Sequence, residues 1–338
     1  MCRRIVPSIV ALPPLLVLAL LTAYPASGQS ARRSSPVKVW GFTGPWDAMS
    51  TRSVRAHGSA LDAVITGWIA FDSATARPIQ PVLYPDTIKA AHGTLRRMAI
   101  VTSWHGDRFH PRTIQTLAGD PTRLGQAAGV IARHAAAMRY RGLVLDFESL
   151  TEHDVDALIK VVRAISDSAH RAGVRPIVVA VPATDTLAYP AHALLEVADL
   201  IMPMLYDQHW SGSTPGAIAD PAWVRETLGR RIAEAGGAGR IVAALPGYGY
   251  RWWTNGRPTD HVSYEEARQI TATARVPLLR DRTTQSLRAV KPGEWEMWVT
   301  DAGLLRALVG DARTAGVRQV ALWRMGQEDA AIWRSVFP

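Results

Sequence analysis

The chain has 338 residues, of which 48% are hydrophobic and 20% charged. These values are close to the average for soluble globular proteins, so a sizeable core can form, and collagen, coiled-coil and repeat-array architectures are excluded. The length suits one large domain, such as an α/β barrel of ~250 residues, or two small ones. The formal net charge is +9. It comes from arginines scattered singly, which argues against nucleic-acid binding and favours an anionic surface such as a cell envelope.

The N-terminal segment has the pattern of a secretory signal peptide. Arg3 and Arg4 precede an apolar run over Ile5–Tyr24, and small residues follow it. We expect residues 1–28 to be removed, which makes the protein secreted or periplasmic, with no stable membrane insertion after cleavage. An uncleaved signal that anchors the protein is the alternative. Cys2 is the only cysteine and would leave with the signal, so the mature chain would form no disulfide.

After a linker over residues 29–36, eight apolar segments have the composition and length of strands. They are Val37–Phe42, Ala63–Phe71, Met98–Ser103, Leu143–Phe147, Ile177–Val181, Leu200–Leu205, Ile241–Leu245 and Val320–Trp323. Four of them directly follow a glycine-containing junction, as expected where a helix leads into a parallel sheet. Eight β–α units predict a closed (β/α)8 TIM barrel over residues 37–338 rather than an open doubly wound sheet.

Helix starts are marked by capping residues. Asp120 and Asp220 each precede a proline, and Ser263 with Glu266 forms a capping box. The succession of β–α units is interrupted over about 277–300, where two segments of alternating polarity flank a Lys-Pro-Gly turn. This pattern predicts a small β-hairpin inserted before the last helix.

The fourth expected strand carries two acids at its C-terminal end, where active sites of such barrels lie. Period-two alternation in residues 142–148 places Val144, Asp146 and Glu148 on one face. Two carboxylates at the barrel mouth raise each other's proton affinity, which prepares one as a general acid. The structural alternative is an acid pair that caps the next helix through Ser149 and Thr151.

Further candidates follow the strand at 200–205. Tyr206 would present its hydroxyl to the acids, Asp207 would lie at the rim, and Met204 would form the floor or belong to the ordinary core.

Tryptophan accounts for 12 residues, and several lie at strand ends, where flat aromatic faces suit sugar rings. The substrate-binding set is completed by Trp323, Trp46, Trp210 and Tyr248. In contrast, we expect packing or surface roles for Trp68, Trp223, Trp298 and Trp333.

Metal chemistry finds little support. Histidines occur near strand ends at His105, His110 and His209, but neither an HxH nor an HExxH motif is present, so we expect no metal site and no cofactor. A Ser/His/Asp hydrolase of the α/β type would need a GxSxG elbow, which the sequence lacks.

These motifs together resemble glycoside hydrolase family 18 over nearly the whole chain after the signal. Residues 142–148 resemble the DGxDxDxE signature, residues 204–207 the MxYD element, and Trp323 the last-strand tryptophan under the sugar. The similarity is greatest to the branch of spore-cortex N-acetylglucosaminidases and envelope polysaccharide hydrolases.

The resemblance implies a substrate-assisted retaining glycosidase. Glu148 would be the proton donor and later the base, while Asp146 and Tyr206 would hold the substrate's acetamido group. The partner would be a polysaccharide that contains N-acetylglucosamine, and we expect a monomer. Where the signature has further aspartates this chain has Arg141 and Val144, so Asp146 lacks the buried carboxylate partner of that signature, and the resemblance implies activity without fixing the rate of turnover.

Two alternatives belong to other functional classes. A non-catalytic glycan-binding barrel would have lost the proton donor, whereas Glu148 is retained. A metal-dependent polysaccharide deacetylase would need a His/Asp cluster, which the motifs do not provide.

Overall fold

The computed structural model describes residues 37–79 and 95–337. The expected signal and linker over residues 1–36 lie outside this range, so both stay predictions. Within the range, no helix is at once long enough and apolar enough to cross a membrane.

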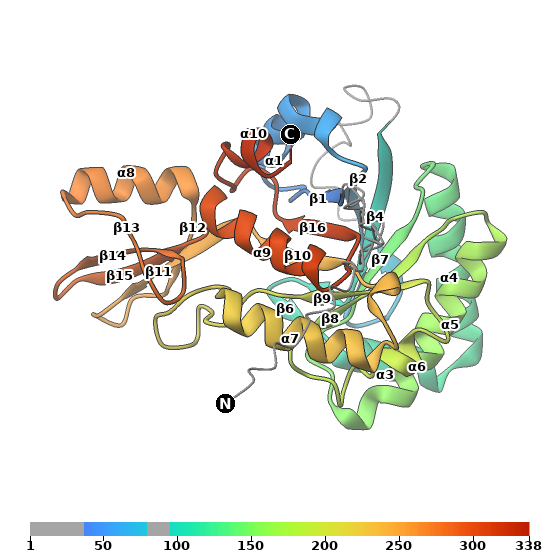
Figure 1. Cartoon of the computed structure of the whole chain (residues 1–338). Helices are drawn as coiled ribbons and strands as arrows, with labels where there is room; N and C mark the ends of the chain where they lie inside the picture. The colour runs from blue at the N-terminus through green and yellow to red at the C-terminus, as the bar shows by residue number, and fades with distance from the viewer. Residues whose placement is uncertain (1–36, 80–94, 338) are drawn as a thin grey trace, which may run out of the picture. The chain divides into compact units, whose positions relative to one another are not determined.

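Eight parallel strands close into a barrel (Figure 1). In barrel order they are β1 (Lys38–Phe42), β2 (Ala63–Phe71), β4 (Arg96–Thr102), β7 (Leu143–Asp146), β8 (Ile177–Pro182), β9 (Leu200–Met204), β10 (Ala243–Pro246) and β16 (Gln319–Trp323). Strand β1 pairs with both β2 and β16, so the ring is complete. Each strand overlaps one of the eight predicted segments, and the predicted TIM barrel is confirmed.

Helices follow most of the barrel strands. They are α1 (Ala48–His57), α3 (Pro111–Gly119), α4 (Pro121–Ala137), α5 (Val155–Arg171), α6 (Ala191–Leu194), α7 (Pro221–Glu234), α9 (Ala302–Thr314) and α10 (Ile332–Ser335). The predicted caps are confirmed, because the carboxylate of Asp120 accepts from the Arg123 amide at 3.0 Å and that of Asp220 from the Trp223 amide at 2.9 Å. Gly173, with φ 75°, ends α5 in the left-handed conformation that favours glycine.

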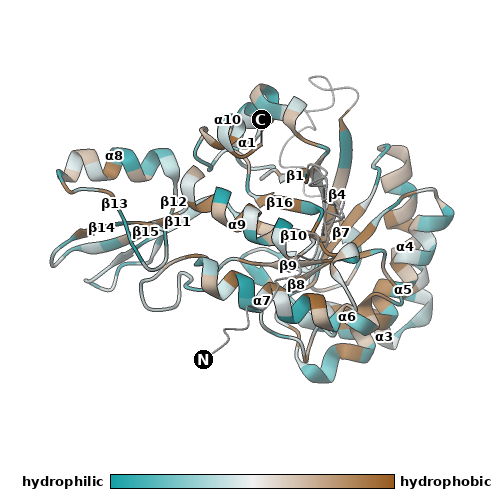
Figure 2. Ribbon diagram, viewed as in Figure 1, coloured by the Kyte–Doolittle hydropathy of each residue, from teal (hydrophilic) through white to brown (hydrophobic). Residues whose placement is uncertain are grey.

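Alternation along the strands sorts the apolar side chains into two layers. One layer fills the barrel interior and includes Ile100, Val144, Val178 and Met202. The other packs between the strands and the helices and includes Leu143, Leu145 and Phe147. Figure 2 shows the consequence, with apolar colour concentrated along barrel strands such as β4 and β7. The predicted orientation of β7, with its acids toward the barrel mouth, is confirmed.

Strand β2 departs from strict alternation. Its pairing with β4 shifts register between Ile65 and Gly67, which is a β-bulge. Before the bulge Ile65 faces the barrel interior, whereas after it Ile69 and Phe71 face the helices. The bulge therefore turns Trp68 toward the barrel mouth.

The connection from β10 to α9 contains an insertion larger than the predicted hairpin. Five antiparallel strands form its sheet: β11 (Tyr248–Trp253), β12 (Asp260–Ser263), β13 (Leu279–Arg280), β14 (Leu287–Lys291) and β15 (Trp295–Val299). Helix α8 (Tyr264–Ala274) begins at the predicted capping box and packs on this sheet (orange in Figure 1). The hairpin expected over 277–300 is β14–β15, and the insertion extends back to Tyr248 because β11 pairs with β15.

Three short strands complete the described structure. Strand β3 (Pro78–Ile79) pairs antiparallel with the end of β2, and β5 (Trp104–His105) pairs with β6 (Arg108–Phe109) beyond the end of β4. Both additions extend the wall at the C-terminal mouth of the barrel.

Candidate active site

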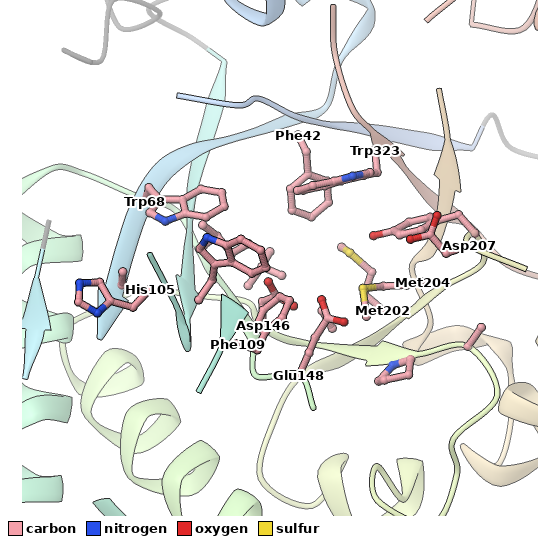
Figure 3. A pocket seen from close by; sticks show the side chains of 18 of the residues that line it. Phe42, Trp68, His105, Phe109, Asp146, Glu148, Met202, Met204, Asp207 and Trp323 are labelled. Atoms are coloured by element: carbon pink, nitrogen blue, oxygen red, sulfur yellow. The ribbon is translucent and has the colours of Figure 1, made fainter. Parts of the chain in front are cut away.

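A cavity of about 1000 Å³ opens at the C-terminal ends of the barrel strands. Figure 3 shows Asp146 and Glu148 near its centre, with Trp68 and His105 toward one end and Met204, Asp207 and Trp323 toward the other. Concave, mostly apolar sites with a few convergent polar groups are the usual form of a substrate pocket.

Asp146 is held at the end of β7 and is 7% exposed. Its Oδ2 accepts from the Thr102 hydroxyl at 3.4 Å, whereas Oδ1 has no hydrogen-bond partner among the described residues. Burial raises the pKa of Asp146 to about 6, although interactions with Glu148 and Thr102 lower it in part. An unsatisfied buried acceptor that lines a cavity is suited to a donor from a bound molecule.

Glu148 lies two residues further along the same face and is partly buried. Burial raises the pKa of Glu148 well above its ordinary value, and the negative charges of Asp146 and Asp207 raise it further. The side chain therefore keeps its proton to higher pH than a free glutamate, as a general acid requires.

Tyr206 and Asp207 follow β9, two strands along the barrel from β7, and line the same pocket as the acids. Burial raises the pKa of the Tyr206 hydroxyl well above its ordinary value, so the phenol remains a donor. The Asp207 carboxylate accepts a short hydrogen bond from the Tyr248 hydroxyl. Burial also raises the pKa of Asp207, and hydrogen bonds from Tyr248 and Tyr250 oppose this effect. Strand β11 of the insertion thus fixes one rim of the pocket.

Aromatic rings surround the carboxylates. Trp323 stacks on Tyr206 with ring centroids 6.4 Å apart and an interplanar angle of 18°, and it meets Phe42 edge-on with centroids 5.2 Å apart. Met204 is half-buried beside both rings and lines the pocket as well. This arrangement forms a flat apolar floor of the kind that suits a sugar ring.

The remaining two predicted tryptophans are placed differently. Trp46 lines the pocket and is 44% exposed. Trp210 is 52% exposed and is not among the described residues that line the pocket. Its carbonyl instead accepts from the Trp252 indole at 3.3 Å, beside the insertion.

Two further tryptophans line the pocket although the sequence suggested packing or surface roles. Trp68 packs edge-on against Trp46 with centroids 5.0 Å apart, and Trp223 lies at the start of α7. Alternation along β2 could not have placed Trp68 in the pocket, because the bulge reverses the alternation after Gly67. For Trp223 the Asp-Pro cap was a usable signal, since it places the first turn of α7 near the barrel mouth. Trp298 and Trp333 are buried, as predicted.

No group of three or more His, Cys, Asp or Glu side chains within residues 37–79 and 95–337 is arranged to hold a metal ion. His105 lines the pocket, but its Nδ1 lies 2.9 Å from the Ser73 hydroxyl at the outer lip.

Comparisons with known proteins agree with the expected resemblance. No family model matches the chain. The chain is 25% identical over 251 residues to the cortical fragment-lytic enzyme of Bacillus subtilis, an alignment that covers 70% of this chain and 58% of that protein. It spans between 38% and 60% of the length of the curated relatives that it matches.

Solved structures share the fold. The spore cortex-lytic enzyme SleL of Bacillus cereus superposes with a TM-score of 0.79 at 18% identity, covering 89% of this chain and 73% of that one. A chitinase of Chromobacterium violaceum superposes with a TM-score of 0.78 at 19% identity, covering 89% and 98%. Together with the sequence relatives, these similarities confirm the predicted resemblance to glycoside hydrolase family 18.

Proposed function

We propose that this chain, which resembles glycoside hydrolase family 18, cleaves polysaccharides of β-linked N-acetylhexosamine by substrate-assisted retaining catalysis. The observation that carries the proposal is the pair of acids at the C-terminal end of β7 and just beyond it, buried Asp146 and partly buried Glu148, in an aromatic pocket at the barrel mouth. The names of the sequence and structure relatives, a cortical fragment-lytic enzyme and a chitinase, support a glycan substrate.

The proposed reaction assigns one role to each polar group. Glu148 donates its proton to the glycosidic oxygen as the bond from C1 to that oxygen breaks. The carbonyl oxygen of the substrate's 2-acetamido group bonds to C1 and forms an oxazolinium ion. Glu148, now a carboxylate, removes a proton from water as the water oxygen bonds to C1. The bond between C1 and the carbonyl oxygen breaks, which restores the acetamido group and leaves Glu148 protonated.

Asp146 and Tyr206 would position the acetamido group during these steps. The unpartnered Oδ1 of Asp146 would accept from the acetamido N–H, and the Tyr206 hydroxyl would donate to its carbonyl oxygen. Trp323 would support the sugar ring from below. Val144 is fully buried, so no acid at that position would assist Asp146.

The proposal includes the cellular location and the assembly state. The charged and apolar pattern of residues 1–28 supports export, so the chain would act in the periplasm or outside the cell. We propose that it acts there as a monomer. The glycan strands of peptidoglycan and chitin both present the required acetamido group.

The test is reducing-end release from N-acetylglucosamine oligomers and from purified peptidoglycan, with Glu148→Gln as the matched variant. We expect release by the wild type and a loss of more than about a hundredfold in Glu148→Gln, because the amide cannot donate the proton. Binding without release in both proteins would instead identify a glycan-binding barrel. Activity that a chelator abolishes would support a metal-dependent enzyme.

A further inference from the structure

The backbone that carries Glu148 lies outside regular structure. Strand β7 ends at Asp146, and the chain then runs through Phe147–Leu150 before the short helix Glu152–Asp154. Ser149 has φ 63°, in the left-handed region that non-glycine residues seldom adopt. A segment with this conformation persists only where its surroundings hold it.

The side chain of Tyr189, between β8 and α6, holds this segment in place. It is 1% exposed, and its hydroxyl donates to the Phe147 carbonyl at 2.9 Å and accepts from the Leu150 amide at 3.1 Å. One oxygen atom therefore joins the two residues that flank Glu148 and Ser149. Both of its hydrogen-bonding roles are used on backbone atoms of this segment.

A buried cation fixes Tyr189 in turn. Arg231 on α7 is fully buried, and its guanidinium donates to the Tyr189 carbonyl at 2.9 Å. Its other partners are the carbonyls of Pro182, Ala183 and Asp185 and the carboxylate of Glu234. Because a buried charge is stable only when its donors are satisfied, this network fixes the path of residues 182–189.

We propose that Tyr189 is a positioning residue for Glu148, and that Arg231 orders the segment from which it acts. The proposal rests on the proposed function, since it assigns Glu148 as the proton donor. Pro182 and Ala183 line the pocket, so the same network also shapes the wall beside that donor. One connected group of hydrogen bonds thus positions both Glu148 and the pocket wall beside it.

The decisive variant is Tyr189→Phe, which removes the hydroxyl and keeps the ring that packs in the core. We expect kcat to fall about 10- to 100-fold with KM within about threefold, because misplaced catalytic groups cost rate rather than ground-state binding. The alkaline limb of the pH–rate profile should move about 0.5 to 1 unit lower, since a looser Glu148 is better hydrated and its pKa falls.

The control is Tyr264→Phe, the same chemical change in α8 of the insertion. We expect kcat and the pH profile of this variant to match the wild type. A merely structural role for Tyr189 would lower the melting temperature of Tyr189→Phe while leaving kcat per folded molecule and the alkaline limb unchanged, and that result would overturn the proposal.

A second measurement is independent of activity. Hydrogen exchange at the Leu150 amide should accelerate at least about tenfold in Tyr189→Phe and stay unchanged in Tyr264→Phe. If the wild type cleaves none of the polymers, the proposed function fails, yet the exchange rates still report whether the hydroxyl holds the segment. Unchanged exchange at Leu150 would overturn the positioning role by itself.

Discussion

At the scale of single residues, the buried position of the pocket acids favours general-acid chemistry but lowers the stability of the folded protein at neutral pH. Burial raises the pKa values of Asp146 and Glu148, so the folded protein favours their protonated forms. Ionisation of either carboxyl group therefore lowers the free energy of unfolding. This loss is absent below the pKa values that the two groups have in the unfolded chain. As pH rises through the folded-state pKa values, the stability that protonation provides is lost.

Asp146→Asn should accordingly stabilise the protein near neutral pH. The pKa of Asp146 rises from the ordinary 3.8 to about 6, so the gain in the free energy of unfolding develops between about pH 4 and 6. We expect about 1 to 3 kcal/mol at pH 7.5 and almost none at pH 4, measured by urea unfolding at both values. A gain of equal size at both pH values would show that the substitution acts through packing instead.

Asp154→Asn is the control, and we expect it to change the stability at neutral pH in the opposite direction. Burial opposes ionisation of Asp154, but hydrogen bonds from Gln115 and Thr151 prevail and lower its pKa. The carboxylate therefore contributes stability that is present at neutral pH and lost on acidification. This variant should be less stable than the wild type at pH 7.5, with a smaller difference at low pH.

At the scale of elements, sequence alternation predicted which way the acids of β7 face, whereas it could not have predicted which way Trp68 on β2 faces. In β7 the pattern Leu143 to Glu148 contains no irregularity, so period-two counting placed Asp146 and Glu148 correctly. In β2 every residue from Ala63 to Phe71 is apolar or small, so nothing in composition marks the bulge. Its position follows from pairing with β4, a long-range contact that one strand's sequence does not encode.

Gly67 lies at the bulge and is closely packed against its neighbours. A Cβ at this position would lie 2.4 Å from Cζ of Tyr140 and 2.6 Å from Cβ of Ala99. Gly67→Ala should therefore lower the free energy of unfolding by about 1 to 3 kcal/mol and raise KM for oligomers, because Trp68 moves with the bulge. Urea unfolding and oligomer kinetics measure the two effects.

Gly125→Ala provides the matched comparison. Gly125 is exposed on α4, and a Cβ there would meet nothing within 4 Å. The same substitution should raise stability by about 0.5 to 1 kcal/mol, since alanine favours helix, and leave KM unchanged. Equal effects of the two substitutions on KM would exclude the link between the bulge and Trp68.

The full extent of the insertion could not be predicted from local sequence patterns. The β14–β15 hairpin is local and was predicted, but β11 joins it across more than forty residues of chain through antiparallel pairing of Tyr250 with Trp298. The consequence reaches the site, because Tyr248 at the start of β11 donates to Asp207. Partners that are distant in sequence thus complete the rim of the pocket.

At the scale of the whole molecule, net charge and pocket charge have opposite signs. The sequence carries +9, and removal of residues 1–28 with Arg3 and Arg4 would leave +7. In contrast, the acidic groups lining the pocket are Asp146, Glu148, Asp207 and the phenol of Tyr206, and the basic group is His105, with no Lys or Arg among the described lining residues. Attraction of an anionic polymer must therefore come from charges outside the pocket, through water.

Salt should consequently separate two classes of substrate. Between about 0.1 and 1 M NaCl the screening length falls from about 10 to about 3 Å, which removes long-range attraction but leaves contacts inside the pocket intact. We expect KM for peptidoglycan, whose strands carry carboxylates, to rise at least about threefold, and KM for neutral N-acetylglucosamine oligomers to change by less than about twofold. Parallel changes for both substrates would show that the positive charge does not recruit the polymer, because neutral oligomers lack the charge on which that attraction acts.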